Sequence, residues 1–117
     1  MRIEVRGRNV EVADELREQV AQRFRRLGKQ VSELATLEVE LSEQRNPSIA
    51  DREVAEATLR LKGVTLRARE ASPDMSHTIH ELAENMGRQI KKHRDLRRKR
   101  QKTRRLVNRM RGRTAES

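Results

Sequence analysis

The groups best suited to chemistry in this sequence are the basic side chains near its C-terminal end. Between residues 88 and 113, fourteen side chains are Lys or Arg and one, Asp95, is acidic. Residues 1–87 are nearly neutral, so the formal net charge of +10 is concentrated in this stretch. Guanidinium and ammonium groups bind phosphates, and a localised positive field attracts polyanions. The sequence therefore predicts a nucleic acid or an anionic membrane surface as the partner.

A second group with chemical potential consists of His77 and His80, followed by Glu81. The spacing of the two histidines could bring two metal ligands together, but no third ligand follows at a recognisable spacing. Glu38 and Glu40 alternate with apolar residues, so they lie on the wet face of a predicted strand with no sign of a pocket. The chain has no cysteine, which excludes disulfides and thiolate metal sites. We expect no catalytic residue, metal, cofactor or small-molecule substrate.

Hydrophobic periodicity predicts the elements that position the basic groups. Apolar and polar residues alternate in four short segments, which predicts strands, at residues 1–6, 37–42, 55–61 and 64–68. Elsewhere apolar residues recur every three or four positions, which predicts two amphipathic helices. Their stripes are Val12, Leu16, Val20, Phe24 and Leu27, and then Met75, Ile79, Leu82, Met86 and Ile90, with Ala83 beside the second. The order β-α-β-β-β-α predicts an α+β fold, a two-layer sandwich with both helices on one face of a four-stranded sheet.

Local signals predict where the helices begin and end. Gly28 stands where a left-handed C-cap residue belongs at the end of the first helix. Ser72, Pro73 and Asp74 predict the start of the second helix, because Ser can cap it and Pro is favoured at the first helical position.

A hairpin is predicted between the last two strands. Lys62 and Gly63 form its two-residue turn, since glycine accepts a positive φ. The resulting register pairs Leu61 with Val64, Leu59 with Leu66, and Glu56 with Arg69. This register is apolar on one face and charge-paired on the other.

The basic stretch contains the end of a folded helix and the start of an extension. Ile90 is the last residue of the apolar stripe, and the segment LRRKRQKTRRL that follows contains good helix formers and no Pro or Gly. We therefore expect a domain over residues 1–96 and a basic extension, helical or disordered, over residues 97–117.

The scarcity of aromatic side chains limits which kind of anionic partner the chain is expected to bind. Phe24 is the one aromatic residue, and it belongs to an apolar stripe. Modules that read single-stranded bases stack them on exposed aromatic rings, whereas Arg and Lys contact phosphates and recognise backbone shape. The basic extension also lacks the Trp, Phe or continuous Leu face of an interfacial helix, and no stretch is apolar enough to span a membrane. We expect a folded RNA as the partner, no membrane, and a cytoplasmic location.

Three segments also resemble a known family. They are RNVEVADELREQVAQRFRRL, LRLKGVTLRA and DMSHTIHELAENMGRQIKKHRD. In this order and spacing they resemble the hibernation-promoting factor and ribosome-associated inhibitor family, also called the sigma-54 modulation or S30EA family, over residues 1 to about 96. The resemblance implies the same fold and binding to the small ribosomal subunit at the decoding centre. There the protein would occlude mRNA and the A- and P-site tRNA and inhibit translation in stationary phase or stress.

The same resemblance implies which residues face ribosomal RNA. They are Arg23, Arg26, Arg88, Lys91, Lys92 and His93. Because both helices lie on one side of the sheet, the five cations are expected to form one continuous basic surface. His93 is as consistent with packing at the domain edge as with touching RNA, and a solvated helix face is the alternative for the others. Accessory contacts are expected from Arg97, Arg98 and Lys99.

The chain departs from the family pattern in two respects, and two other functions are alternatives. Ser76 stands where family members often carry an aromatic residue. The dimerisation domain of long family members is absent, so we expect either a short form or a fragment of a long one. A general double-stranded or structured RNA-binding module is the alternative function, although its usual order is α-β-β-β-α with lysines at the start of the last helix. An enzyme or ribosome-modifying factor would need a nucleophile, base or metal cluster that the sequence does not show.

Overall fold

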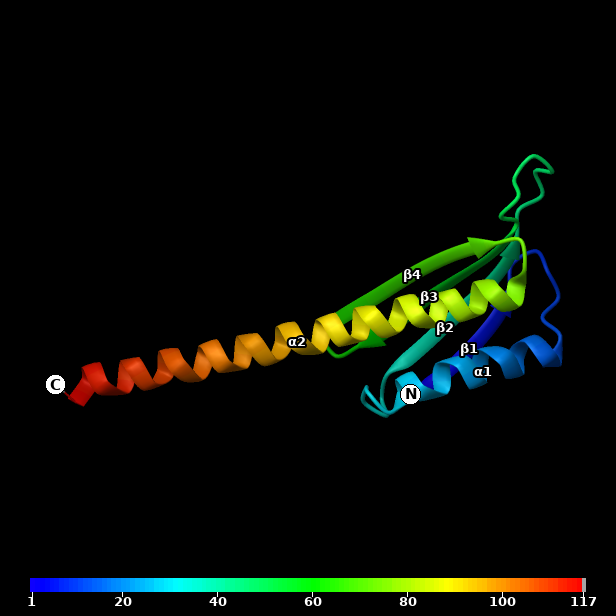
Figure 1. Cartoon of the computed structure of the whole chain (residues 1–117). Coiled ribbons are helices and arrows are strands. Elements are labelled where there is room, and N and C mark those ends of the chain that lie inside the picture. Colours follow the sequence, from blue (N-terminus) through cyan, green and yellow to red (C-terminus); the bar gives the residue numbers. More distant parts are fainter. Residues whose placement is uncertain (117) are drawn as a thin grey trace.

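The computed structural model describes the backbone of residues 1–116 and the side chains of residues 1–110. The elements are β1 (Arg2–Gly7), α1 (Asp14–Gly28), β2 (Thr36–Glu43), β3 (Glu53–Leu61), β4 (Val64–Ser72) and α2 (Met75–Glu116). Figure 1 shows both helices packed on one face of a single sheet. The predicted order and the two-layer α+β fold are therefore confirmed.

The sheet has the strand order β1-β2-β3-β4. β1 runs parallel to β2, and the other neighbours are antiparallel. The parallel pair follows from the chain path, because α1 connects β1 to β2 and crosses over the sheet face. The hairpin register is as predicted, with Leu61 opposite Val64 and Leu59 opposite Leu66, and Gly63 takes a φ of 80° at the turn.

The core lies between the helices and the inner face of the sheet. The central strands contribute Leu37, Val39, Leu41, Ala55, Ala57 and Leu59, and the helices contribute Val20, Phe24, Leu27, Ile79, Leu82, Ala83, Met86 and Ile90. Each large side chain buried here contributes about 1.5–3 kcal/mol. Val12, Leu16 and Met75 are only partly buried at the edges of this core. The two predicted helical stripes are confirmed, although Val12 precedes α1.

The outer face of the sheet carries charges that compensate one another. Arg6 Nη2 lies 3.0 Å from Glu40 Oε2, and Arg60 Nη1 lies 2.8 Å from Glu38 Oε1. The predicted pair of Arg69 and Glu56 is also present, with 3.3 Å between Nε and Oε1. Such exposed pairs contribute only about 0–1 kcal/mol each to stability. Their main consequence is that this face presents little net field.

The end of α1 differs from the prediction for Gly28. The residue after it, Lys29, is right-handed with a φ of −75°, and among the described non-proline positions only Gly63 has a positive φ. The backbone N–H groups of Lys29 and Gln30 donate to Arg26 O and Leu27 O, at 3.3 and 3.0 Å. These tight i to i−3 bonds satisfy the last carbonyls, so no left-handed cap is needed. The prediction of a left-handed Gly28 was wrong.

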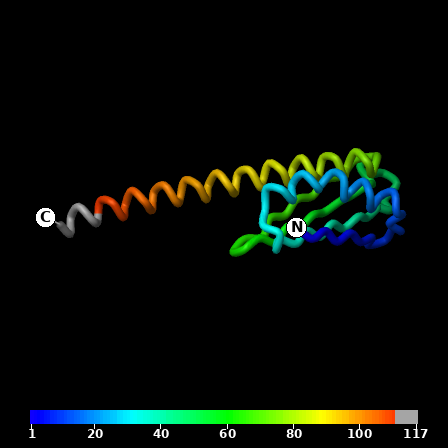
Figure 2. Tube along the Cα trace, turned by 90° about the horizontal axis from the view of Figure 1, so that it is seen from below, coloured from blue at the N-terminus to red at the C-terminus, as the bar shows by residue number. Residues whose placement is uncertain are grey.

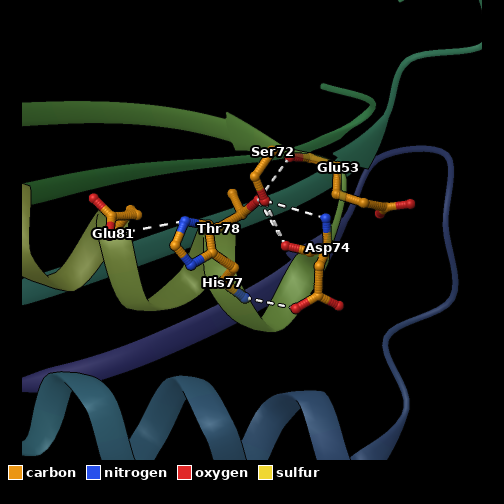
Figure 3. Close-up of polar contacts among 6 residues, drawn as sticks. All are labelled: Glu53, Ser72, Asp74, His77, Thr78 and Glu81. Carbon is orange, nitrogen blue, oxygen red and sulfur yellow. Dashed lines mark hydrogen bonds and ion pairs between the residues drawn. The ribbon is translucent and has the colours of Figure 1, made fainter. Parts of the chain in front are cut away.

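The start of α2 also differs from the prediction. The helix begins at Met75, and its cap is Asp74, whose Oδ2 accepts a hydrogen bond from the His77 N–H at 3.1 Å (Figure 3). Ser72 and Pro73 both precede the helix. The Ser72 hydroxyl accepts a hydrogen bond from the Asp74 N–H at 3.2 Å and lies 2.6 Å from the hydroxyl of Thr78. The Ser72 side chain, which was predicted to cap the helix, is thus in contact with Thr78.

The hydroxyl of Thr78 ties the start of α2 to the sheet. Thr78 is fully buried, and its Oγ1 lies 2.9 Å from the backbone carbonyl of Glu53 on β3. We expect Thr78→Val to lower the free energy of unfolding by about 1–2 kcal/mol, because it leaves buried polar groups without a partner. Urea denaturation would measure this loss. The same change at exposed Thr65 on β4 is the control, and an equal effect at both positions would contradict the role of the buried hydroxyl.

The carboxyl group of Glu53 makes the stability of the fold depend on pH. Partial burial, followed by the nearby carboxylates of Glu43 and Asp74, raises the pKa of Glu53, and Arg52 opposes them. The folded protein therefore holds this proton more tightly than the unfolded chain, so this group's contribution to stability falls as pH rises through the interval between the two pKa values. We expect Glu53→Gln to be more stable than the unchanged protein at pH 7 by less than about 1 kcal/mol. Thermal melts should show this advantage shrinking at acidic pH, and an advantage independent of pH would refute the assignment.

α2 continues well past the sheet as a single helix. It has 42 residues, which corresponds to about 60 Å at 1.5 Å per residue. The molecule is 72 Å long and only 29 by 18 Å across, and Figure 2 shows the helix leaving the two-layer body. No helix in the described part of the chain is long and apolar enough to cross a membrane. The body and the extension thus share one helical axis.

Candidate nucleic-acid interface

A groove of about 770 Å³ lies between α1 and α2. We call it the interhelical groove, and its basic lining residues are Arg23, Arg26, Arg88, Lys91 and Arg94. Four of these five were predicted from the sequence. The structure thus brings together cations from two helices that are far apart in the chain.

The buried stripes explain this convergence. Phe24 and Leu27 are buried beneath α1, which leaves Arg23 and Arg26 exposed on its flank. Gly87 of α2 lies against α1, since a Cβ there would be 3.4 Å from Leu27 Cδ2. This small residue allows the helices to approach closely. The interhelical groove is therefore lined by three cations that follow Gly87 along α2, Arg88, Lys91 and Arg94.

The charge of the interhelical groove is largely uncompensated. Within residues 1–110, whose side chains the structure describes, Arg23, Arg26, Arg88 and Lys91 make no ion pair. Glu84 is the one carboxylate among the described lining residues. On the outer sheet face, in contrast, four arginines are paired with glutamates, namely Arg2, Arg6, Arg60 and Arg69. The folded domain therefore presents its unpaired positive charges on the side where the helices lie.

Arg94 was missed in the sequence analysis. It lines the interhelical groove, is half-buried, and its Nε has no hydrogen-bond partner among the described residues. A buried donor without a partner costs about 1–3 kcal/mol, so this placement is not explained by stability. A spacing of three residues places Arg88, Lys91 and Arg94 along one flank of α2. This spacing is the signal in the sequence from which Arg94 could have been predicted.

Lys92 and His93 lie on a different flank of α2. They line a second groove of about 900 Å³ between α2 and the turn joining β3 to β4, together with Arg97. We call it the hairpin groove. Lys92 therefore lines a different groove from Arg88 and Lys91, because successive residues on a helix point about 100° apart. All three nevertheless line a common hollow on α2 together with Lys99. Arg98 and Lys99 are exposed on α2 and line neither of these two grooves.

His93 is half-buried where it lines the hairpin groove. Both of its expected roles, packing at the domain edge and contact with a ligand, are compatible with this position. Ser76, where the resemblance to the family leads one to expect an aromatic ring, donates a hydrogen bond to Gln19 Oε1 at 2.9 Å. That contact links α2 to α1 instead.

The histidines near the start of α2 diverge. His77 Nε2 lies 3.9 Å from Glu81 Oε1 on the exposed side of the helix (Figure 3), whereas His80 lines the interhelical groove. Among the residues that the structure describes, no three His, Cys, Asp or Glu side chains are grouped closely enough to hold a metal ion. The Arg and Lys side chains that converge in the two grooves can bind phosphates.

Comparison with known proteins identifies the family of this chain. The model of the Sigma 54 modulation protein / S30EA ribosomal protein family matches residues 3–98. The chain belongs to this family. The part of α2 beyond residue 98 lies outside the match.

Several relatives of this family member carry related names. The ribosome hibernation promoting factor of Acinetobacter guillouiae is 29% identical over 101 residues, which cover 82% of this chain and 89% of the relative. The protein of the same name from Escherichia coli is 30% identical over 95 residues, which cover 81% and 95%. The ribosome hibernation promotion factor of Lactococcus lactis is 33% identical over 99 residues, covering 80% of this chain but 49% of that longer relative.

Solved structures share the fold. The N-terminal domain of Protein Y from Thermus thermophilus superposes with a TM-score of 0.69 at 26% identity, covering 80% of this chain and 99% of that domain. A ribosomal subunit interface protein from Coxiella burnetii gives the same TM-score of 0.69 at 21% identity, with coverage of 81% and 99%. The second likeness supports the two-layer architecture alone.

Proposed function

We propose that this family member is a ribosome hibernation factor. It binds the RNA of the small ribosomal subunit at the decoding centre, in the cytoplasm, and occludes mRNA and the A- and P-site tRNA. Translation is thereby inhibited in stationary phase or stress. The observation that carries the proposal is the interhelical groove, in which Arg23, Arg26, Arg88 and Lys91 converge with no ion pair within residues 1–110. The names of the relatives support the ribosome as the partner.

The proposed mechanism is occlusion, in which no covalent bond is made or broken. The planar guanidinium of Arg88 suits forked contacts to one phosphate, whereas Lys91 acts as a point charge. The single Phe, Tyr or Trp residue, Phe24, is fully buried, so the domain exposes none of the large aromatic rings on which single-stranded bases usually stack. Recognition then depends on the positions of phosphates in a folded RNA rather than on its base sequence.

The extension adds further phosphate contacts in this proposal. Arg97, Arg98 and Lys99 are exposed on the part of α2 that leaves the body. Because they continue the helix that lines both grooves, they lie close to the same RNA surface. Their role is accessory, since the cations of the interhelical groove define the site.

Co-sedimentation with ribosomes tests the proposal. The protein should sediment with empty ribosomes and be excluded from ribosomes that carry mRNA and tRNA, because the ligands compete for one space. Equal binding to both would refute occlusion. Equal binding to ribosomes and to an unrelated RNA duplex would favour the alternative, a general structured-RNA-binding module.

A further inference from the structure

The hairpin groove is a second cationic site on the opposite flank of α2. Lys62 projects from the turn between β3 and β4, and Lys92, Arg97 and Arg100 come from α2. The remaining lining includes an apolar floor of Val64, Leu66 and Leu96. None of the described lining residues is Asp or Glu. The four cations of the hairpin groove therefore match the net charge of the interhelical groove, where Glu84 offsets one of five cations.

Its charges are uncompensated. Lys62, Lys92, Arg97 and Arg100 make no ion pair with any side chain in the described range 1–110. On the adjoining outer face of β3, Arg60 is paired with Glu38 at 2.8 Å. The chain therefore has acidic partners for cations on the sheet but places none in this groove. Clustered like charges repel one another, and an external anion relieves that repulsion.

The shape of the site favours RNA over a membrane. Val64 and Leu66 are half-buried in a concave surface between the hairpin and α2, and only Leu96 among the three apolar side chains is exposed, so the groove offers a flat bilayer little apolar area. A sugar-phosphate backbone is narrow enough to enter. Its riboses can contact the floor while its phosphates meet the basic rim. Contact with the floor also displaces water, which strengthens the charge interactions.

The two grooves cannot be filled by one contact. Lys92 lines the hairpin groove and Arg94, two residues later, lines the interhelical groove. Residues two positions apart project about 200° from each other, so the two grooves lie on nearly opposite sides of α2. A helix with its side chains is about 10–12 Å across. Two backbone stretches, one on each flank, are needed to neutralise both sets of cations.

We propose that the hairpin groove binds the backbone of a second RNA segment, while the interhelical groove binds the first. The C-terminal half of the folded part of α2 is then held between two RNA backbones. This inference rests on the proposed function and adds a second contact to the same partner. Two linked contacts raise the overall affinity well above that of either one.

Hydroxyl-radical footprinting on purified small ribosomal subunits tests this inference. The variant carries Lys62→Glu with Arg100→Glu, and the control carries Arg45→Glu with Arg67→Glu, two exposed arginines outside both grooves. The variant should lose one set of protected nucleotides, keep the other set, and bind about 10- to 100-fold more weakly. The control should keep both sets. The retained set also shows that the variant is folded.

Other outcomes overturn the inference in distinguishable ways. Protections and affinity that match the control would mean that the hairpin groove does not touch RNA. Simultaneous loss of both sets would contradict two separate segments. Weaker binding with unchanged protections would indicate a ribosomal protein in the groove. If the unchanged protein protects no nucleotides at all, the proposed function fails, and the inference fails with it.

Discussion

Reversing two charges in the interhelical groove, Arg88→Glu with Lys91→Glu, should lower the affinity for the small ribosomal subunit by about 10²- to 10⁴-fold. Charge-assisted hydrogen bonds contribute about 1.5–3 kcal/mol each, and two are lost. The new carboxylates also repel the phosphates. Both positions are exposed, so the fold should be retained. Equilibrium binding to labelled small subunits would measure the change.

Salt dependence separates this effect from a loss of structure. The logarithm of the binding constant should fall with the logarithm of salt concentration by roughly 0.9 for each neutralised phosphate, on the scale of duplex DNA. The slope for the Arg88 and Lys91 variant should be shallower by about two such contacts. Reversal of Arg45 and Arg67 is again the matched control. Unchanged affinity and slope would place the RNA-binding site elsewhere.

Phe24→Ala should lower the free energy of unfolding by about 3–5 kcal/mol. Phe24 is fully buried between α1 and the sheet and is the only aromatic residue in the chain. Its removal leaves a cavity that neighbouring side chains cannot fill completely. Because small domains have a total stability of about 5–15 kcal/mol, a large fraction would be lost.

Urea denaturation would measure this destabilisation, with Phe24→Leu as the conservative control. The leucine variant should lose less stability, because most of the buried volume is kept. RNA binding should weaken only as far as the folded population falls, since Phe24 contacts no solvent. A small effect of Phe24→Ala would contradict the tight docking of α1 that positions Arg23 and Arg26.

The elements of this fold could be predicted because their patterns are local. Alternation places Leu37 and Val39 on the inner face, and helical spacing places Phe24 and Met86 in the core, as the structure shows. The hairpin register followed from a turn in which Gly63 accepts a positive φ. Each of these features depends on residues that are neighbours in the sequence.

The helix boundaries were less predictable because several residues compete for the same role. Ser72 and Asp74 are both good helix caps, and the choice between them depends on Thr78, whose hydroxyl engages Ser72 across the turn. Gly28 is compatible with a left-handed cap, but tighter hydrogen bonds of Lys29 and the next residue make that cap unnecessary.

The candidate site was predicted in part. Its residues on α1 and α2 could be assigned to one side of the sheet, because both helical stripes face the same core. The division between the two grooves depends on how close the β3–β4 turn comes to α2, which no local pattern reveals. Lys62 and Arg100 were missed for this reason, since they are distant in the chain and meet only in the folded protein.

The compensated sheet face and the basic end of α2 together give the molecule a large electric dipole moment. One end carries paired charges, and the other carries most of the net charge on a helix that extends the molecule to 72 Å. The field of a nearby polyanion therefore exerts a torque on this dipole and turns the basic end of α2 toward the polyanion before contact. This alignment acts within the screening distance of about 8–10 Å at physiological salt and extends further in dilute salt. The extension thus shortens the rotational search for a productive encounter, whichever nucleotides it finally touches.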